Sequence, residues 1–393
     1  MWWIAPTLLV AAWILWASMD APQAATALTA PAAGPAVPRT MPATANAAPF
    51  SASGVQARLD QRALWQQRLE RAQATLDAYN RSTRYPHESQ PISEHADQAY
   101  PNRPIDEDHA LTTSNGRAID GVRLRTSQER VFVQGSESVR FTLSVVDKDG
   151  QAMPLRVVRA TAHEVPAPRV ALMYPDVAMN FNDDGASGDV AAGDKVYSAQ
   201  LQPSTQGFAG LFGQIRVEAF LQYGDKDAFT YFDVMYTPEP PATWEAGVRE
   251  AIEDGSLAFH LRAKVTEAGR YVVSARVDDV NGKPFALLTF NEELAAGSQD
   301  VRLVLFGKLA RDAKLAFPVT LRDVDAFLLR PDAFPDRRLM PRLAGVVHTS
   351  KSYPLVSFSD APWTSEERTR YLTELTRDLN EAQAKVDQLA KGP

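Results

Sequence analysis

Apolar and polar residues alternate along much of the middle of the chain, which is typical of half-buried β-strands. In the run Val139–Val145, for example, an apolar side chain occupies every second position. Similar short runs recur between residues 155 and 236 and between residues 259 and 324. In the second set, Asn281-Gly282 is a strong hairpin signal. The pattern predicts an all-β middle region of short strands and frequent turns.

A proline cluster, Pro238-Glu239-Pro240-Pro241, divides this region in two, because proline cannot donate to a sheet ladder. Each part has the size and strand spacing of an immunoglobulin-like β-sandwich. We therefore predict a mainly β fold with one sandwich at residues 116–241 and a second at residues 242–345. A single larger sandwich or barrel is the alternative.

Helical periodicity flanks the β region on both sides, within residues 55–115 and 346–393. The first segment begins with one apolar stripe, formed by Trp65, Leu69, Ala72, Leu76 and Tyr79, and continues as an extended polar segment. In the second segment a capping-box pattern from Thr364 to Glu367 precedes a seam formed by Leu372, Leu375, Leu379, Ala382, Val386 and Leu389. The two helices either pair with each other, associate between copies of the chain, or pack separately on the β region.

The N-terminal residues have a different composition. Residues 2–19 carry no formal charge and include tryptophans near both ends. An apolar helix of roughly 20 residues can span a bilayer, and tryptophan favours its interfaces. We predict a membrane anchor here; a cleaved signal peptide and a buried core helix are the alternatives. The Ala- and Pro-rich residues 20–54 are expected to form a tether, or a low-complexity tail without a spacing role.

Composition excludes several functions. The 393 residues carry a net charge of −7 without a basic block, so we expect no nucleic-acid partner. The absence of cysteine excludes disulfides, thiolate chemistry and a lipid anchor on cysteine. Nucleophile, phosphate-loop and dinucleotide motifs are also missing from the sequence, so we predict no enzyme and assign no catalytic residue or organic cofactor.

The acidic loop, which we define as residues 182–197, concentrates carboxylates and glycines just before a predicted strand. Calcium prefers six to eight oxygen ligands, often on a loop bent by glycine. The candidate ligands for Ca²⁺ are Asn182, Asp183, Asp184, Asp189 and Asp194. The alternative is turn chemistry alone, in which Asp and Asn form Asx-turns and the glycines take positive φ.

Two weaker candidates remain. The histidines between His87 and His109 lie among acidic residues. They are the candidate ligands of a zinc site, although the sequence contains no His-Glu-x-x-His motif. A sugar-stacking platform is conceivable on Tyr223, Phe229, Tyr231, Phe232 and Tyr236. Aromatic residues at strand spacing more often belong to a core.

The acidic loop and the following Val196-Tyr197 are similar to the Asp-Asp-Gly…Gly-Asp…Ala-Gly-Asp-Gly-x-Tyr signature of bacterial exported β-sandwich modules, except that Lys195 replaces a glycine. Gly269-Arg270-Tyr271, Leu303–Gly307 and Trp363–Glu367 are similar to companion segments of the same proteins. Together these residues resemble the choice-of-anchor X family of bacterial envelope proteins. The resemblance implies an exported, anchored protein with two sandwiches, and it provides no catalytic residues.

These observations predict an envelope protein that binds or scaffolds another envelope component, a protein or a polysaccharide. It would be anchored in the inner membrane through residues 2–19 and face the periplasm, or be secreted if the leader is cleaved. Self-association would use the C-terminal helix. The alternative class is a metal-dependent hydrolase or a carbohydrate-processing protein of the envelope, with candidates in the His87–His109 segment.

Overall fold

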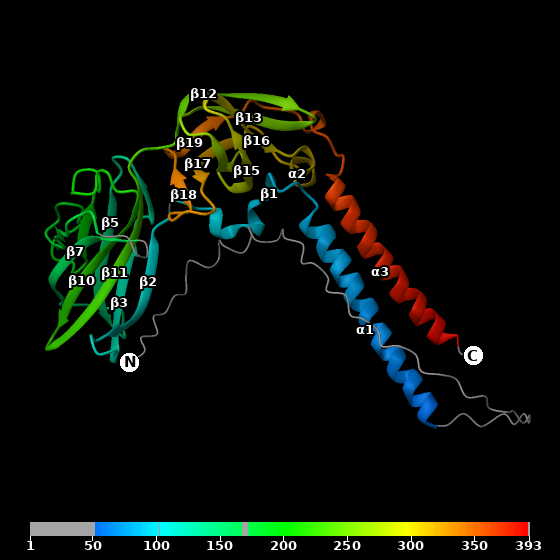
Figure 1. Ribbon diagram of the computed structural model, residues 1–393, viewed down its shortest axis with the longest axis horizontal. Coiled ribbons are helices and arrows are strands. Elements are labelled where there is room, and N and C mark those ends of the chain that lie inside the picture. Colours follow the sequence, from blue (N-terminus) through cyan, green and yellow to red (C-terminus); the bar gives the residue numbers. More distant parts are fainter. Residues whose placement is uncertain (1–51, 102, 167–171, 392–393) are drawn as a thin grey trace, which may run out of the picture. The chain divides into compact units, whose positions relative to one another are not determined.

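The computed structural model describes residues 52–101, 103–166 and 172–391 (Figure 1). The predicted membrane segment at residues 2–19 and residues 20–51 of the predicted tether lie outside this part of the chain. Within the described residues, no helix is both long and apolar enough to cross a bilayer. The chain divides into compact units at residues 1–60 and 61–393, and apart from residues 52–60 of the first helix the description below concerns the second unit.

The first β body consists of two sheets, in which all strand pairs are antiparallel except β4 with β11. One sheet has the order β2-β3-β5-β6, with β9 also paired to β5; these strands are Ile105–Thr112, Ala118–Gln128, Val139–Asp147, Ala152–Met153 and, for β9, Tyr197–Leu201. The other has the order β4-β11-β10-β7-β8; these strands are Phe132–Gln134, Lys226–Thr237, Gly213–Tyr223, Arg156–Val165 and Val177–Met179. Both sheets contribute to one apolar core, in which Phe141 and Ile215 are fully buried.

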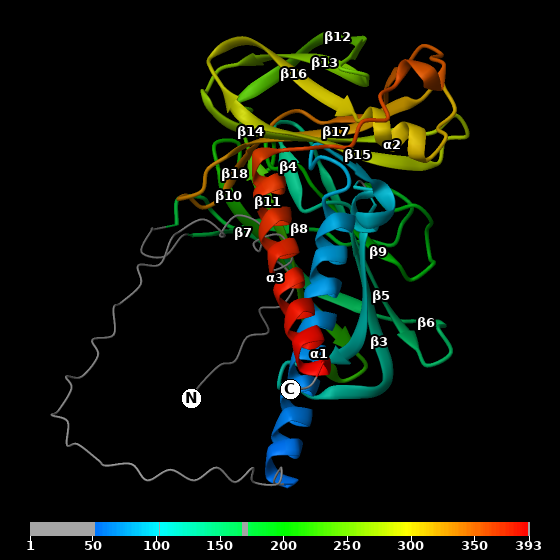
Figure 2. The same cartoon turned by 90° about the vertical axis from the view of Figure 1, so that its right-hand side faces the viewer.

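The second β body repeats this construction with different strands. A sheet of order β12-β13-β16 comprises Ala242–Glu253, Ser256–Val265 and Gly297–Leu305. The larger sheet has the order β1-β15-β14-β17-β18, with β19 also paired to β17; these strands are Ser89–Pro91, Pro284–Leu294, Gly269–Asp278, Thr320–Leu329, Arg337–Leu339 and, for β19, Leu343–Thr349. Figure 2 shows the smaller sheet as one layer and β14, β15 and β17 as the other.

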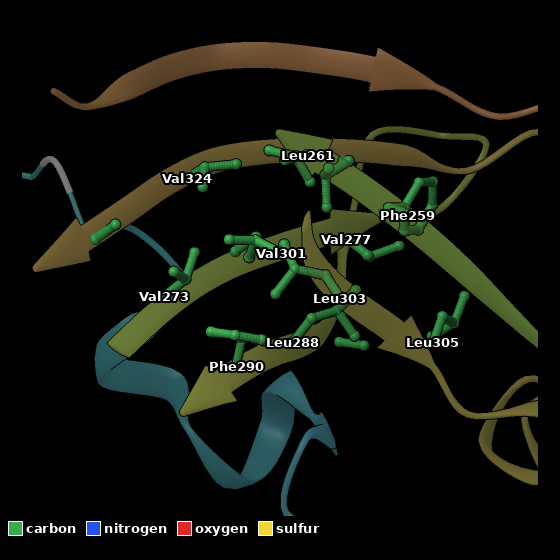
Figure 3. Packing of buried hydrophobic residues seen from close by; sticks show 14 of the residues in the cluster. Phe259, Leu261, Val273, Val277, Leu288, Phe290, Val301, Leu303, Leu305 and Val324 are labelled. Carbon is green, nitrogen blue, oxygen red and sulfur yellow. The ribbon is translucent and has the colours of Figure 1, made fainter. Parts of the chain in front are cut away.

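The core of the second body lies between these two layers. Phe259 on β13 and Leu303 on β16 face Val273 on β14 and Leu288 on β15, and all four are fully buried (Figure 3). Alternation of apolar residues along each strand produces this arrangement, because successive side chains point to opposite faces of a sheet. The mainly antiparallel β fold expected from the sequence is therefore confirmed, and its layers are those of a β-sandwich.

Helices are few in the described residues. The long ones are α1 (Ala52–Ser82) and α3 (Glu366–Ala390), and α2 (Gly307–Asp312) is short. Three 3₁₀ turns are η2 (Ile92–Glu94), η3 (Ala96–Gln98) and η4 (Leu355–Ser357). The N-cap of α3 is Ser365, one residue after the predicted Thr364; its hydroxyl accepts the backbone N–H of Arg368 at 3.0 Å.

The end of α1 contacts the start of α3. Arg368 donates from Nε to the carbonyl and the hydroxyl of Thr83 at 3.0 and 3.1 Å, and the rings of Tyr79 and Tyr371 are 5.8 Å apart. The predicted seam of α3 is its least exposed face, with Ala382 and Val386 buried. These contacts lie where the two helices meet, and among the three arrangements that the sequence left open they favour intramolecular pairing.

The polar segment after α1 is divided between the two β bodies. β1 pairs with β15, and the hydroxyl of Ser89 accepts the backbone N–H of Phe306 at 2.9 Å. β2 pairs with β3 and belongs to the first body, although the sequence pattern assigned residues 105–112 to an extended segment. The pattern does not reveal this strand because Leu111 is its only buried residue.

Replacing Leu303 by alanine should lower the free energy of unfolding by about 2–5 kcal/mol, because the fully buried side chain leaves a cavity between the sheets. Urea denaturation followed by tryptophan fluorescence measures this loss. Val346→Ala on β19 is the control, since Val346 is 63% exposed. Equal midpoints for the two variants would contradict the described core.

Candidate cation-binding loop

The acidic loop connects β8 to β9 and is fixed at its base. The backbone N–H groups of Asn182 and Ser198 each donate to the other's carbonyl, at 3.0 and 2.9 Å. Ser198 lies on β9, which pairs with β5, and the neighbouring Phe181 belongs to the core of the first body. The sheet therefore positions both ends of the loop.

Three of the predicted ligands converge. One carboxylate oxygen each from Asp183, Asp189 and Asp194 lies within 4.8 Å of the others. The ion pairs found among the described residues join other carboxylates to Lys, Arg or His, and none includes these three. Carboxylates this close repel one another when ionised, so a bound cation would relieve an unfavourable interaction.

Backbone N–H groups of the loop hold Asp183 in place. Its Oδ1 accepts the N–H groups of Gly193 and Asp194 at 2.7 and 3.1 Å, and its Oδ2 accepts the N–H of Lys195 at 3.0 Å. One carboxylate thus ties the start of the loop to its end. The oxygens retain lone pairs for a further ligand, because a carboxylate offers about four acceptor sites.

Asp189 is stabilised in its charged form. Its Oδ2 accepts the N–H of Gly185 at 2.7 Å, and its Oδ1 accepts the hydroxyl of Ser198 at 3.2 Å and the N–H of Val190 at 3.0 Å. The Gly185 N–H, with further help from these two donors, holds the pKa of Asp189 below its usual value. Asp189 is therefore ionised at neutral pH, and the stabilisation that it contributes is lost as the pH falls through this lowered pKa.

Asn182 presents an oxygen without a partner. Its side-chain N–H₂ group donates to the Asp184 carboxylate and, at 3.4 Å, to the carbonyl of Ala186. Its Oδ1 is buried and accepts no hydrogen bond from the described residues. Buried acceptors without partners are uncommon, and an amide oxygen is a ligand that calcium takes. Carboxylate and amide oxygens together fit a hard cation such as Ca²⁺ better than zinc.

Turn chemistry also operates in this loop, as the alternative interpretation required. Gly185, Gly188 and Gly193 have φ values of +73°, +99° and +77°. Asp184 forms an Asx-turn by accepting the N–H of Ala186 at 2.9 Å, and it is not one of the converging carboxylates. Asp194, one of the converging carboxylates, also forms an Asx-turn by accepting the N–H of Val196 at 2.9 Å, so turn chemistry and a cation site are both compatible with this loop.

In the part of the chain that the structure describes, the predicted histidines belong to no group that could hold a metal ion. His87 lies 3.4 Å from the adjacent Glu88, whereas His109 is exposed on β2. Of the aromatic candidates, Phe232 and Tyr236 are core residues, whereas Phe229 and Tyr231 lie exposed on the opposite face of β11 with their rings 6.2 Å apart. The Ser198 hydroxyl, which contacts Asp189, was missed by sequence reasoning because a single serine in a strand gives no signal.

Lys195 is expected to be a strained position, because it has φ +64° where the resembling signature has glycine. Lys195→Gly should raise the free energy of unfolding by about 0.5–1 kcal/mol, even though the side chain loses its 2.8 Å bond to the carbonyl of Ala152. Chemical denaturation measures the change. Lys148→Gly, at an exposed turn residue without positive φ, should instead be destabilising. Equal losses for both variants would show that residue 195 is unstrained.

No family model and no curated protein matches the chain. A DUF4785 family protein from Legionella pneumophila is similar in structure over 58% of this chain, with 13% identity and a TM-score of 0.39, and the chain spans 57% of that protein's length. The native conformation of α2-macroglobulin from E. coli is similar over 63% of this chain and 18% of its own, with 9% identity and a TM-score of 0.25. Similarities of this size assign neither a family nor a function.

Proposed function

We propose that this chain is a calcium-stabilised binding or scaffolding protein of the bacterial cell envelope, composed of two tandem immunoglobulin-like β-sandwiches. The observation that carries the proposal is the convergence of Asp183, Asp189 and Asp194 without a cationic partner among the described residues. The resemblance of the acidic loop to the signature of exported modules supports the same proposal. So do the two layered β bodies and the uncharged residues 2–19.

Calcium bound at this loop would act on stability. The ion needs the three carboxylates together, and only the folded chain brings them together, since the loop closes on the Asn182–Ser198 bridge. A ligand that binds the folded state alone stabilises it by mass action. Extracellular modules bind calcium with dissociation constants of about 10⁻⁴–10⁻³ M, which suits an envelope compartment.

A binding role is favoured over the alternative, a metal-dependent hydrolase or a carbohydrate-processing protein. Hydrolytic metal sites combine ligands with a concave pocket and an open coordination position. In the described residues, the cluster able to hold a metal is all carboxylate and lies on a surface loop. His87 and His109 lie in different β bodies, so the predicted zinc alternative gains no support from them.

Millimolar Ca²⁺ should raise the melting temperature of the chelator-treated protein. At about 10 mM, which is about 100 times a dissociation constant of about 10⁻⁴ M, the gain is about 2.7 kcal/mol, or about 5–10 °C for a domain of this size. Differential scanning fluorimetry with EDTA, Mg²⁺ and Ca²⁺ measures the shift. Asp183→Asn and Asp194→Asn should abolish it. Asp184→Asn is the matched control, since Asp184 lies outside the converging group, and it should keep the shift. An unchanged melting temperature of the wild-type protein in the presence of calcium would exclude the site.

The envelope role predicts where the chain is found and what it captures. Fractionation of cells should place the intact chain with the membranes or the exported proteins. Affinity capture from solubilised envelopes should recover the same envelope component with the intact chain and with a chain that starts at Gly54. Residence in the cytosol, or capture of no envelope component by either chain, would contradict the proposed role.

A further inference from the structure

A second feature of the molecule lies in the second β body, away from the acidic loop. We call it the arginine hollow. Its wall is formed by the segment that follows η3 and by the turn between β14 and β15, and its lining includes Tyr100, Pro101, Arg103, Gly282, Pro284 and Arg322. A Cβ atom placed on Gly282 would meet no atom within 4 Å, so the hollow is open at this turn.

Buried Arg276 also lines the arginine hollow, and all three nitrogens of its guanidinium are engaged. Its Nε and Nη2 donate to the fully buried Asp278 at 2.7 and 3.1 Å. Its Nη1 donates to the carbonyl of Ala99, and its Nη2 also lies 3.5 Å from Asp323. This residue is therefore structural, because it fixes the segment after η3 onto β14.

Arg322 makes far fewer hydrogen bonds than Arg276 does. It makes one long contact, 3.5 Å from Nη1 to Asp278, and its buried Nε has no hydrogen-bond partner in the described part of the chain. One third of its side chain is exposed. A guanidinium carries five N–H donors, and leaving a buried donor unpaired is unfavourable. The Nη groups of Arg322, whose printed contact among the described residues is the long one to Asp278, are therefore the donors available for a ligand with acceptor oxygens.

Arg103 adds a second available guanidinium at the rim. It is exposed, and no side-chain hydrogen bond or ion pair engages it among the residues that the structure describes. The hollow thus has three guanidiniums, those of Arg103, Arg276 and Arg322. The carboxylates of Asp278 and Asp323 neutralise two of these charges, which leaves an excess of one positive charge. The planar fork of arginine matches a carboxylate, so the hollow suits an anionic group.

Tyr100 supplies an apolar contact next to these donors. Its side chain is 59% exposed, and the Arg276 guanidinium lies 5.4 Å from the ring centroid. Pro101 and Pro284 extend this apolar wall. An exposed aromatic ring beside charged donors can take the apolar C–H face of a sugar while the arginines take its acid group. A peptide is less well suited, because β1 already occupies the edge of β15 where an added strand would pair.

We propose that the arginine hollow binds a uronic acid unit of an acidic polysaccharide, with its carboxylate on Arg322 and Arg103 and its ring on Tyr100. This inference rests on the proposed binding role and names a ligand class for it. It does not depend on the acidic loop, since the two sites share no residue.

Calorimetric titration of the full chain with oligogalacturonate tests the proposal against three comparison ligands: a neutral galactose oligosaccharide, acetate and inorganic phosphate. The acidic oligosaccharide should bind at least ten times more tightly than each of them. Arg322→Lys should lose at least tenfold in affinity, because a point charge replaces the fork. Arg103→Gln and Tyr100→Ala should lose comparably, and both alter exposed side chains that folding does not require.

Arg370→Gln on α3 is the matched control for Arg103→Gln, since Arg370 is likewise an exposed arginine and does not line the arginine hollow. It should bind as the unaltered chain does. Equal binding of the neutral oligosaccharide, equal binding of acetate or phosphate, or an equal loss in Arg370→Gln would each overturn the assignment. If oligogalacturonate does not bind but the affinity capture still recovers an envelope component, this ligand class is excluded and the proposed binding role is retained.

Discussion

Burial of apolar side chains between two sheets is the interaction on which both β bodies depend. In the second body, residues such as Phe259 and Leu303 are completely removed from water, and removal of apolar area contributes about 25 cal/mol per Å². This packing occupies the inner faces of the strands. Candidate chemistry therefore lies outside the cores. The acidic loop connects two strands, and the arginine hollow combines the segment after η3 and the turn between β14 and β15 with Arg276 and Arg322 on strands.

The two sites represent opposite electrostatic situations. In the acidic loop, backbone N–H groups hold Asp183 and Asp189 close to Asp194, and no ion pair with a described Lys, Arg or His balances these carboxylates. In the arginine hollow, Asp278 and Asp323 engage Arg276, and the Nε of Arg322 finds no hydrogen-bond partner among the described residues. Each site thus carries an uncompensated charge of one sign, and each charge indicates a ligand of the other sign.

Much of the fold could be predicted because it follows from periodicity. The alternation at Tyr271, Val273 and Val277 gave the correct buried face of β14, and the seam of α3 is its least exposed face. β2 was missed, since an exposed edge strand has almost no apolar pattern. In the acidic loop, composition alone indicated the ligands, yet only the fold distinguishes Asp184 from the three carboxylates that converge. The arginine hollow gave no signal at all, because Arg103 and Arg322 are more than 200 residues apart in the sequence and no motif connects them.

The central claim is that the converging carboxylates form one specific cation site. Isothermal titration of the metal-free full chain with calcium chloride measures this directly, as a stoichiometry. The account predicts one Ca²⁺ per chain, with the binding heat absent in Asp189→Asn and retained in Asp184→Asn. No heat of binding, or several weak sites that are unaffected by Asp189→Asn, would contradict it.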